Sequence, residues 1–187
     1  MPRTKQYKEQ EVVEKAMQLF WRNGYETTSM HMLEKQMRIN KFSIYASFGS
    51  KDGVFLESIK CYEQQLNRLI DKLEKSSNGA DGIKEYFRDF LEFSKDNGRG
   101  KGCLITNTAN EIGQDADEKI KKVLTDFLKR VRTVFAQLLE QDRTKNLELI
   151  AAQADYLIIS MFGLSSASRV FGPDQMENYI ENIFSNL

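Results

Sequence analysis

Apolar residues recur at helical spacing in nearly every segment of the chain. Over residues 7–23 they fall on one face with charged residues opposite, which predicts an amphipathic helix that Gly24 ends. A short second helix is expected after Thr27, Thr28 and Ser29, which are all suitable N-caps. Arg38-Ile39-Asn40 forms a tight connection to a third short helix that runs to about residue 48.

The rest of the chain repeats the helical pattern over longer stretches. Ser50 can cap a long helix that ends near residue 75. Loops rich in Gly, Ser, Asn and Asp are expected over 76–82 and 96–102. The remaining predicted helices cover residues 83–93, 103–112, 116–141 and 147–170, and a last helix runs from Pro173 or Asp174 to the C-terminus. Nine helices and no convincing strand predict an all-α fold.

The first three helices have the pattern of a helix-turn-helix packed on a longer first helix. In that arrangement the inward set is Leu33, Met37, Ile39, Ile44 and Phe48. The outward set of the third helix is Lys41, Phe42, Ser43, Tyr45 and Ser47. Lysine and serine can bond base edges or phosphates, and an exposed phenylalanine can touch a thymine methyl. An ordinary small helical bundle with one solvated helix is the alternative interpretation of the same pattern.

Charge and composition modify this picture only slightly. The net charge is +0, but residues 1–51 hold 9 Lys and Arg against 5 Asp and Glu. A basic first segment on a mildly acidic remainder favours a nucleic-acid-facing end. We therefore expect a DNA-binding domain over residues 1–50 and a second domain over residues 51–187 that does not face DNA.

Several kinds of chemistry are disfavoured. His31 is the single histidine, so neither a metal site, a di-iron bundle nor nucleophilic catalysis has the partners it needs. The glycines at 98, 100 and 102 lack the spacing and the preceding strand of a phosphate-binding loop. We expect no enzyme, no cofactor and no metal. Two distant cysteines and no visible secretory signal favour the cytoplasm.

A resemblance to a known family sharpens the prediction. The residues that carry it are Ala16, Leu19, Phe20, Gly24, Tyr25, Thr28, Ser29, the run 40–45, Phe48, Ser50, Lys51, Asp52, Val54 and Phe55. This pattern resembles the signature of TetR-type repressors over about 45 residues. The resemblance implies a homodimeric repressor that leaves its operator when a small molecule enters the C-terminal domain. A helical interaction module without DNA binding is the alternative.

This chain departs from the family pattern at two positions. Arg38 occupies the turn position that is usually glycine, so it would need a left-handed backbone. Phe42 replaces a frequent glycine and enlarges the reading surface. The expected DNA contacts are Thr28, His31, Lys41, Phe42, Ser43, Tyr45, Ser47 and Lys51. For His31, a surface position without a role is the alternative.

The helix over 147–170 is unusual because Asp155 is the only charge between Leu149 and Ser168. Its length could span a membrane, but its serines and Gln153 make it too polar for a lone span. A helix with core on one face and a second copy of the chain on the other is the expected arrangement. The family resemblance implies a four-helix dimer interface from the last two helices. The expected close-approach residues are Ser160, Gly163 and Ala167.

Residues 102–111 resemble a Gly-Cys-Leu-x-x-Asn segment found in a subset of TetR-type proteins. Cys103 is either a small hydrophobe at a helix start or a thiolate sensor of electrophiles or oxidants, stabilised by the helix with Arg99 and Lys101. Cys61 is expected in the core. The candidate ligand or sensing residues are Tyr62, Phe90, Cys103, Asn107, Phe127 and Asp155. The expected effector is hydrophobic or electrophilic.

Overall fold

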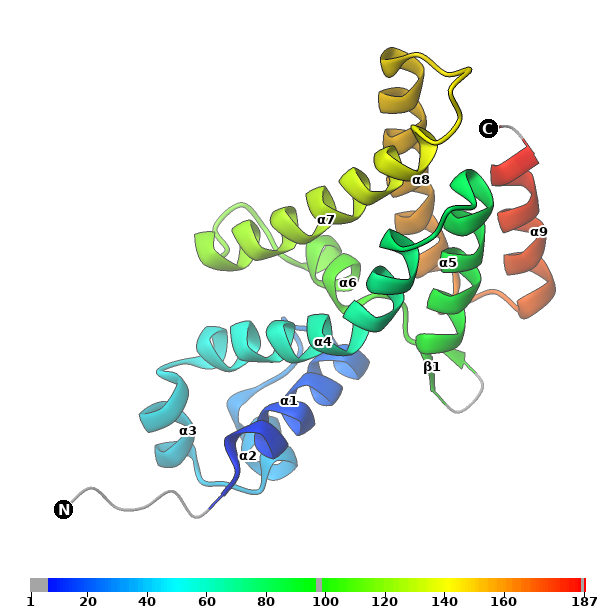
Figure 1. Cartoon of the computed structure of the whole chain (residues 1–187). Helices are drawn as coiled ribbons and strands as arrows, with labels where there is room; N and C mark the ends of the chain where they lie inside the picture. Colours follow the sequence, from blue (N-terminus) through cyan, green and yellow to red (C-terminus); the bar gives the residue numbers. More distant parts are fainter. Residues whose placement is uncertain (1–6, 97–98, 186) are drawn as a thin grey trace.

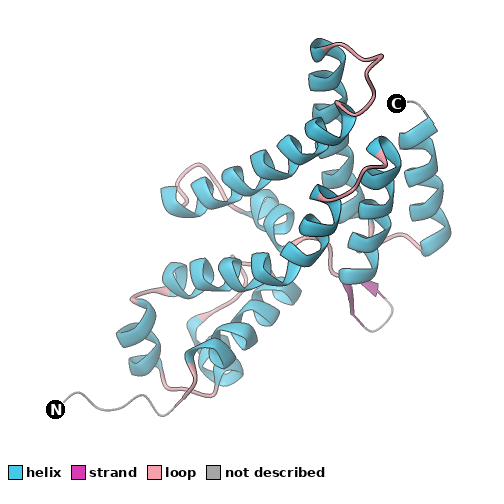
Figure 2. Ribbon diagram, in the orientation of Figure 1, coloured by secondary structure: helices cyan, strands magenta, loops and turns pink. Residues whose placement is uncertain are grey.

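The computed structural model describes residues 7–96, 99–185 and 187. Within these residues the chain forms nine α-helices and one very short β-hairpin (Figures 1 and 2). The helices are α1 Glu9–Asn23, α2 Met30–Met37, α3 Lys41–Phe48, α4 Lys51–Glu74, α5 Gly79–Phe93, α6 Leu104–Glu111, α7 Glu118–Leu139, α8 Leu147–Ala167 and α9 Pro173–Ser185. The predicted all-α fold is confirmed.

The hairpin is the one element that the sequence pattern did not predict. Strands β1 Lys95–Asp96 and β2 Arg99–Gly100 pair antiparallel within the glycine-rich loop. Strands of two residues are too short to produce an alternating apolar pattern, so periodicity could not reveal them. Figure 1 shows α1–α3 together at one end of the molecule, α5–α9 at the other, and α4 leading from one group to the other.

Side-chain caps define the beginnings of five of the described helices, which are α2, α3, α4, α7 and α8. Asn40 accepts a hydrogen bond from the Ser43 N–H, and Ser50 accepts one from the Gly53 N–H. Both caps were predicted. Of the three candidate caps for α2, Ser29 has this role, since its hydroxyl accepts the Met32 N–H. These contacts satisfy helix N–H groups that have no carbonyl partner within the helix.

The core of the N-terminal unit forms where α1 packs on α4. Phe20 and Phe55 are fully buried and meet edge to face at 5.0 Å between ring centroids. The predicted inward residues Leu33, Met37 and Ile44 are at most 1% exposed. The other two predicted residues, Ile39 and Phe48, are half-buried against the same core. This packing fixes α2 and α3 on the α1–α4 pair.

Helix α5 begins at Gly79, four residues earlier than the sequence pattern indicated. The reason is a contact from the turn after α7. Gln141 accepts the Gly79 N–H at 2.9 Å and donates to the Ser76 carbonyl at 2.9 Å. A side chain 62 residues away therefore fixes the start of α5, which a local pattern cannot predict.

Helix α8 is long and apolar enough to cross a membrane by length and composition. In the fold one side of it is buried, including Ile150, Ala154 and Leu157, where α8 packs against α7. The other side is open: Ile159 is 69% and Tyr156 is 44% exposed. The single chain therefore leaves an apolar face of α8 uncovered.

Candidate nucleic-acid interface

The turn between α2 and α3 contains a strained residue. Arg38 has φ 58° and ψ 35°, and it is the only non-glycine residue with positive φ in the described part of the chain. Its N–H donates to the Glu34 carbonyl at 3.0 Å and so closes α2. The left-handed conformation costs an L-residue about 1 kcal/mol. The strain predicted from the sequence is therefore present.

The first turn of α3 is held by α2 as well as by its own cap. The Glu34 carboxylate accepts the Lys41 N–H at 2.6 Å. A carboxylate at a helix N-terminus is stabilised by the free N–H groups and the helix dipole. Sequence reasoning missed this role of Glu34, although a glutamate seven residues before the helix start is visible in the sequence. The contact fixes the angle between α2 and α3.

The outward side of α3 exposes two aromatic side chains to solvent. Phe42 is 81% and Tyr45 is 43% exposed, whereas Ile44 between them is fully buried. Lys41 is exposed at the start of the helix, with its Nζ 5.8 Å from the centre of the Tyr45 ring. Ser43 is half-buried on the same helix. An aromatic and basic surface on a short, rigidly capped helix is suited to a groove of DNA.

Ser47 is placed differently from the other outward residues. Its hydroxyl lies 2.6 Å from the Tyr7 hydroxyl, which also lies 3.5 Å from the Ser43 carbonyl. Tyr7 thus ties the segment before α1 to the last turn of α3. Ser47 already has a partner within the chain, and its primary role in the fold is to position α3. Sequence reasoning missed Tyr7 because the two residues are 40 positions apart.

Lys51 begins α4 and is oriented by the turn after α1. Its Nζ lies 4.5 Å from the centre of the Tyr25 ring and 3.3 Å from the Glu26 carbonyl. The Tyr25 hydroxyl donates to Asp52 at 2.5 Å. Burial, and then the Asp52 carboxylate, raise the pKa of Tyr25 well above its ordinary value, so the hydroxyl keeps its proton. Tyr25 is therefore a fixed support for the Lys51 ammonium.

Two expected DNA contacts near α2 have different outcomes. Thr28 is fully buried, and its hydroxyl donates to the Gly24 carbonyl at 2.6 Å. The expectation that its side chain contacts DNA is therefore wrong, because the turn after α1 uses the hydroxyl internally. His31 is exposed in the first turn of α2, where it is accessible from solvent.

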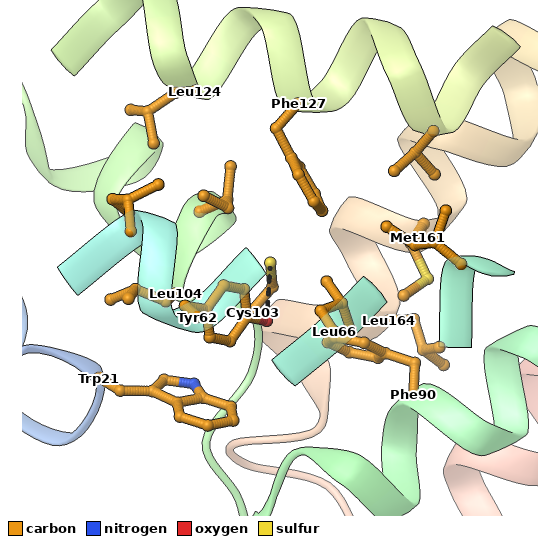
Figure 3. Close-up of a cluster of buried hydrophobic side chains, with 14 of the residues drawn as sticks. Trp21, Tyr62, Leu66, Phe90, Cys103, Leu104, Leu124, Phe127, Met161 and Leu164 are labelled. Atoms are coloured by element: carbon orange, nitrogen blue, oxygen red, sulfur yellow. Dashed lines mark hydrogen bonds between the residues drawn. The ribbon is translucent and has the colours of Figure 1, made fainter. Parts of the chain in front are cut away.

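Tyr62, Phe90, Cys103 and Phe127 are brought together in the C-terminal core (Figure 3). The Tyr62 hydroxyl donates to the Cys103 sulfur at 3.4 Å. The open space between the side chains of this cluster is about 20 Å³, roughly the room that one water molecule needs. The apolar residues around it that sequence reasoning missed are Leu66, Tyr86, Leu128, Val131, Ile158, Met161 and Phe162. The predicted ligand region is closed in this structure.

The surroundings of Cys103 favour a packing role. The side chain is 4% exposed, and burial raises the pKa of its thiol, although the Tyr62 hydroxyl acts in the opposite direction. Lys101 does not face the sulfur, since its ammonium lies 3.7 Å from the Trp21 ring and 3.3 Å from the Gln18 side chain. A reactive thiolate needs an electropositive and accessible site, and Cys103 has neither here. Cys61 is half-buried.

Two further candidate ligand residues lie outside this cluster. The Asn107 amide donates to the Lys101 carbonyl at 2.8 Å and so holds the loop before α6. Asp155 is on the exposed side of α8, where its carboxylate pairs with Arg132 at 2.5 Å. Asp155 does not line the space near Cys103 in this structure, because its carboxylate is exposed to solvent and is held by Arg132 of α7.

The small residues of α8 allow close approach within the chain itself. Ser160 is buried, and its carbonyl accepts a hydrogen bond from the Tyr179 hydroxyl at 3.4 Å. A Cβ atom on Gly163 would lie 2.9 Å from the same hydroxyl. Ala167 is half-buried at the end of the helix. Ser160 and Gly163 therefore accommodate α9 of the same chain.

A surface groove of about 760 Å³ lies between α5, β2 and the connection from α8 to α9. Its lining includes Arg88, Val170, Phe171, Met176 and Glu177. None of the six candidate ligand or sensing residues lines it. This groove is thus separate from the predicted ligand region.

Both ends of α6 contact α1 or the turn that follows it. Ahead of α6, the Trp21 indole N–H donates to the Gly102 carbonyl at 2.9 Å. At its other end, the Glu111 carboxylate accepts the Glu26 N–H at 3.1 Å. Gly24 suits the turn beside Glu111 because its φ of 91° is a backbone conformation that L side chains rarely adopt. These contacts join the helix next to Cys103 to the helix-turn-helix unit.

Comparison with known proteins agrees with this geometry. Residues 12–58 match the family described as bacterial regulatory proteins, tetR family. The HTH-type transcriptional regulator YezE of Bacillus subtilis is 30% identical over 112 residues, which are 59% of this chain and 58% of that protein. IcaR of Staphylococcus aureus, a negative transcriptional regulator of the biofilm operon icaADBC, is 24% identical over 92% of this chain and 96% of its own.

Solved structures show the same fold over the full length. The TetR family regulator CifR, with three cysteines replaced and in complex with a 26-base-pair operator DNA, has a TM-score of 0.86 at 22% identity. The match covers 98% of both chains. Residues 12–58 thus match the tetR family of bacterial regulatory proteins, and the whole chain shares its fold with these structures.

Proposed function

We propose that this chain is a transcriptional repressor, and not an enzyme, which binds operator DNA in the bacterial cytoplasm. The observation that carries the proposal is the surface of α3, where Phe42 and Lys41 are exposed around the fully buried Ile44. Phe42 does not stand alone, because Lys41 and the partly exposed Tyr45 are on the same short helix, and such an aromatic and basic surface fits a groove of DNA. The operator-bound state of CifR and the repressor role of IcaR support the same function.

Each exposed residue has a distinct role in this proposal. Lys41, Phe42 and Ser43 read base edges in the major groove, Phe42 by contact with a thymine methyl. Tyr45 and Lys51 bind phosphates, which sets the register without reading sequence. The contacts of Lys51 with Tyr25 and Glu26 orient its ammonium before DNA arrives. The proposed domain limits are 1–50 and 51–187, and Lys51 contributes to the DNA-binding surface from the first residue of the second domain.

The repressor acts as a homodimer through α8 and α9. Leu149, Ala152, Tyr156, Ile159 and Gly163 are all exposed on α8. Their alternating steps of three and four residues give one apolar row along the helix, which we call the α8 row. That spacing is the one by which two helices pack together. A second copy of the chain, related by a twofold axis, would cover both rows at once.

Release from DNA requires a small hydrophobic or electrophilic effector to open the closed core near Cys103. Ligand sites have volumes of about 300–1,000 Å³, so the side chains around Phe90 and Phe127 must move apart. Helix α6 would transmit this movement, because it carries contacts to Trp21 and Glu26 at its two ends. We also propose that the chain belongs to the subset with the Gly-Cys-Leu-x-x-Asn segment.

Selection of bound duplexes from a random DNA pool tests the proposal. The selected duplex then serves for variants: Lys51→Ala should weaken all sequences about equally, and Phe42→Ala or Lys41→Ala should change the preferred sequence. Identical behaviour of the two classes would contradict the assignment of α3 as the reading helix. A wild-type chain that selects no sequence and binds without salt dependence would instead be the DNA-free interaction module.

A compound screen on the same duplex tests effector release. Electrophiles and oxidants form one arm, with Cys103→Ser as the variant and Cys61→Ser as the matched control. If a compound still releases the Cys103→Ser variant from DNA, the thiol is not needed, and reversible binding of a hydrophobic compound would be the mechanism. Release lost only in Cys103→Ser would establish the thiol as the sensor.

A further inference from the structure

The outward face of α2 carries basic side chains that the proposed roles do not use. His31, Lys35 and Arg38 are exposed; His31 and Lys35 stand four residues apart on one side of α2, and Arg38 directly follows the last residue of the helix. We call these three residues the basic row of α2. Glu34, the acidic residue of the helix, is half-buried, and its carboxylate accepts the Lys41 N–H. The row therefore remains positively charged at its Lys35–Arg38 end.

The backbone conformation at position 38 is one that disfavours arginine. The left-handed conformation favours glycine, and asparagine is the best tolerated alternative. The one backbone contact of Arg38, from its N–H to the Glu34 carbonyl, would form equally well with glycine. In residues 7–96, 99–185 and 187, no carboxylate lies within ion-pair distance of the Lys35 or Arg38 side chain. The Arg38 side chain therefore adds no contact to the fold that explains its presence, and we look for its role in binding a partner.

We propose that Lys35 and Arg38 bind the phosphates of the DNA strand beside the groove that α3 enters. This inference rests on the proposed DNA binding. In a helix-turn-helix the first helix crosses the backbone while the second lies in the major groove. Arg38 stands three residues before Lys41, and Figure 1 shows the α2–α3 connection at the edge of the N-terminal unit that faces away from α5–α9. A guanidinium can bind a phosphate with two parallel hydrogen bonds.

The test separates the backbone effect of Arg38 from the effect of its charge. Arg38→Gly removes both charge and strain, whereas Arg38→Lys keeps the charge in the same strained turn. Lys35→Gln removes the other charge, and Lys129→Gln, on the exposed surface of α7, is the matched control. Affinity is measured by fluorescence anisotropy from 50 to 300 mM salt (a range of roughly this width resolves the slope). The probes are the selected duplex and an unrelated duplex of equal length.

For Arg38→Gly we expect binding to both duplexes to weaken at least about fivefold, with a salt slope lower by about one per side chain. Its melting temperature should stay equal or rise, because glycine adopts the left-handed conformation freely. Arg38→Lys should keep the wild-type slope, Lys35→Gln should lower it, and Lys129→Gln should change nothing. If Arg38 only shaped the turn, Arg38→Gly would not weaken DNA binding while leaving the melting temperature equal or higher.

Three results would overturn the inference. Arg38→Gly could bind with wild-type affinity and slope, Arg38→Lys could lose as much slope as Arg38→Gly, or Lys35→Gln could leave the slope unchanged. A wild-type chain that binds no duplex with salt dependence is a different result. It would refute the proposed function itself and is seen before any variant is made.

Discussion

The two ends of the molecule present their candidate functional residues in opposite ways. On α3, Phe42 and Tyr45 project into solvent from a helix that is capped and braced before any partner binds. In the C-terminal core, Phe90 and Cys103 are buried, and the space between them and their neighbours is about 20 Å³. The proposed DNA-binding surface is thus preformed, whereas the proposed sensing core would have to open at a cost in packing energy.

This difference assigns distinct physical roles to the two regions. A preformed surface binds with little loss of conformational entropy, so its affinity depends on the groups that it exposes. A closed core admits a ligand only to the extent that the ligand stabilises an open state. Stability and DNA binding should therefore respond to different substitutions.

The largest expected effect is a contrast between two phenylalanines. Phe90→Ala removes a fully buried ring and should lower the free energy of unfolding by about 3–5 kcal/mol. Phe42→Ala removes a ring that is 81% exposed and should change stability by no more than about 0.5 kcal/mol. Urea denaturation of the two variants, with the slope of the transition checked for equality, measures both values.

Phe42→Ala should instead change which DNA sequence is preferred. Phe90→Ala should leave that preference unchanged under conditions in which the variant remains folded. Equal losses of stability in the two variants would contradict the division between a preformed surface and a closed core.

An intermediate effect is expected for thiol reactivity. Cys103 is buried and Cys61 half-buried, and burial raises the pKa of both thiols. Accessibility should then separate their rates: in single-cysteine variants, Cys103 should react with iodoacetamide at least about tenfold more slowly than Cys61 at neutral pH. Mass spectrometry follows the modification, and both rates should become equal in denaturant. A Cys103 that reacts faster than Cys61 in the native protein would establish an activated thiolate and an accessible core.

The smallest effect concerns the ion pair that joins α5 to α9. The Arg88 guanidinium donates to Glu177 at 3.0 Å and lowers the pKa of that carboxyl. A lowered folded-state pKa means that the stabilisation is present above the ordinary glutamate pKa of about 4.3 and is lost as pH falls through the lowered value. Because the pair is exposed, it should contribute no more than about 0.5 kcal/mol.

Urea denaturation of the wild type and Glu177→Gln at pH 7 and at strongly acidic pH measures this contribution. The difference between the two proteins should vanish at the acidic pH. A difference that persists there would show that packing of α9, and not the charge of Glu177, stabilises this contact.

Local patterns predicted most of the fold because helices and their caps are encoded within a few residues. The caps Asn40 and Ser50 and the buried Leu33, Met37 and Ile44 all depend on spacings of three to seven residues. The left-handed Arg38 was predicted on a different ground, since the family pattern usually has glycine at this turn position.

The errors arose where a side chain is used by a distant part of the chain. Ser47 contacts Tyr7 across 40 positions, and Trp21 contacts Gly102 across 81. Asp155 was a candidate ligand residue, but in the fold its carboxylate pairs with Arg132 of α7. Such contacts depend on how helices pack, which a single sequence does not specify.

The α8 row has a consequence for the amount of protein that a cell maintains. An isolated chain leaves Leu149, Tyr156 and Ile159 open to water. Pairing depends on concentration, so the fraction of chains with this surface covered rises with copy number. Quality-control proteases and chaperones act on chains that expose such surfaces. The pairing constant would therefore set the lifetime of the regulator as well as its activity, and newly made copies would be removed until enough have accumulated to pair.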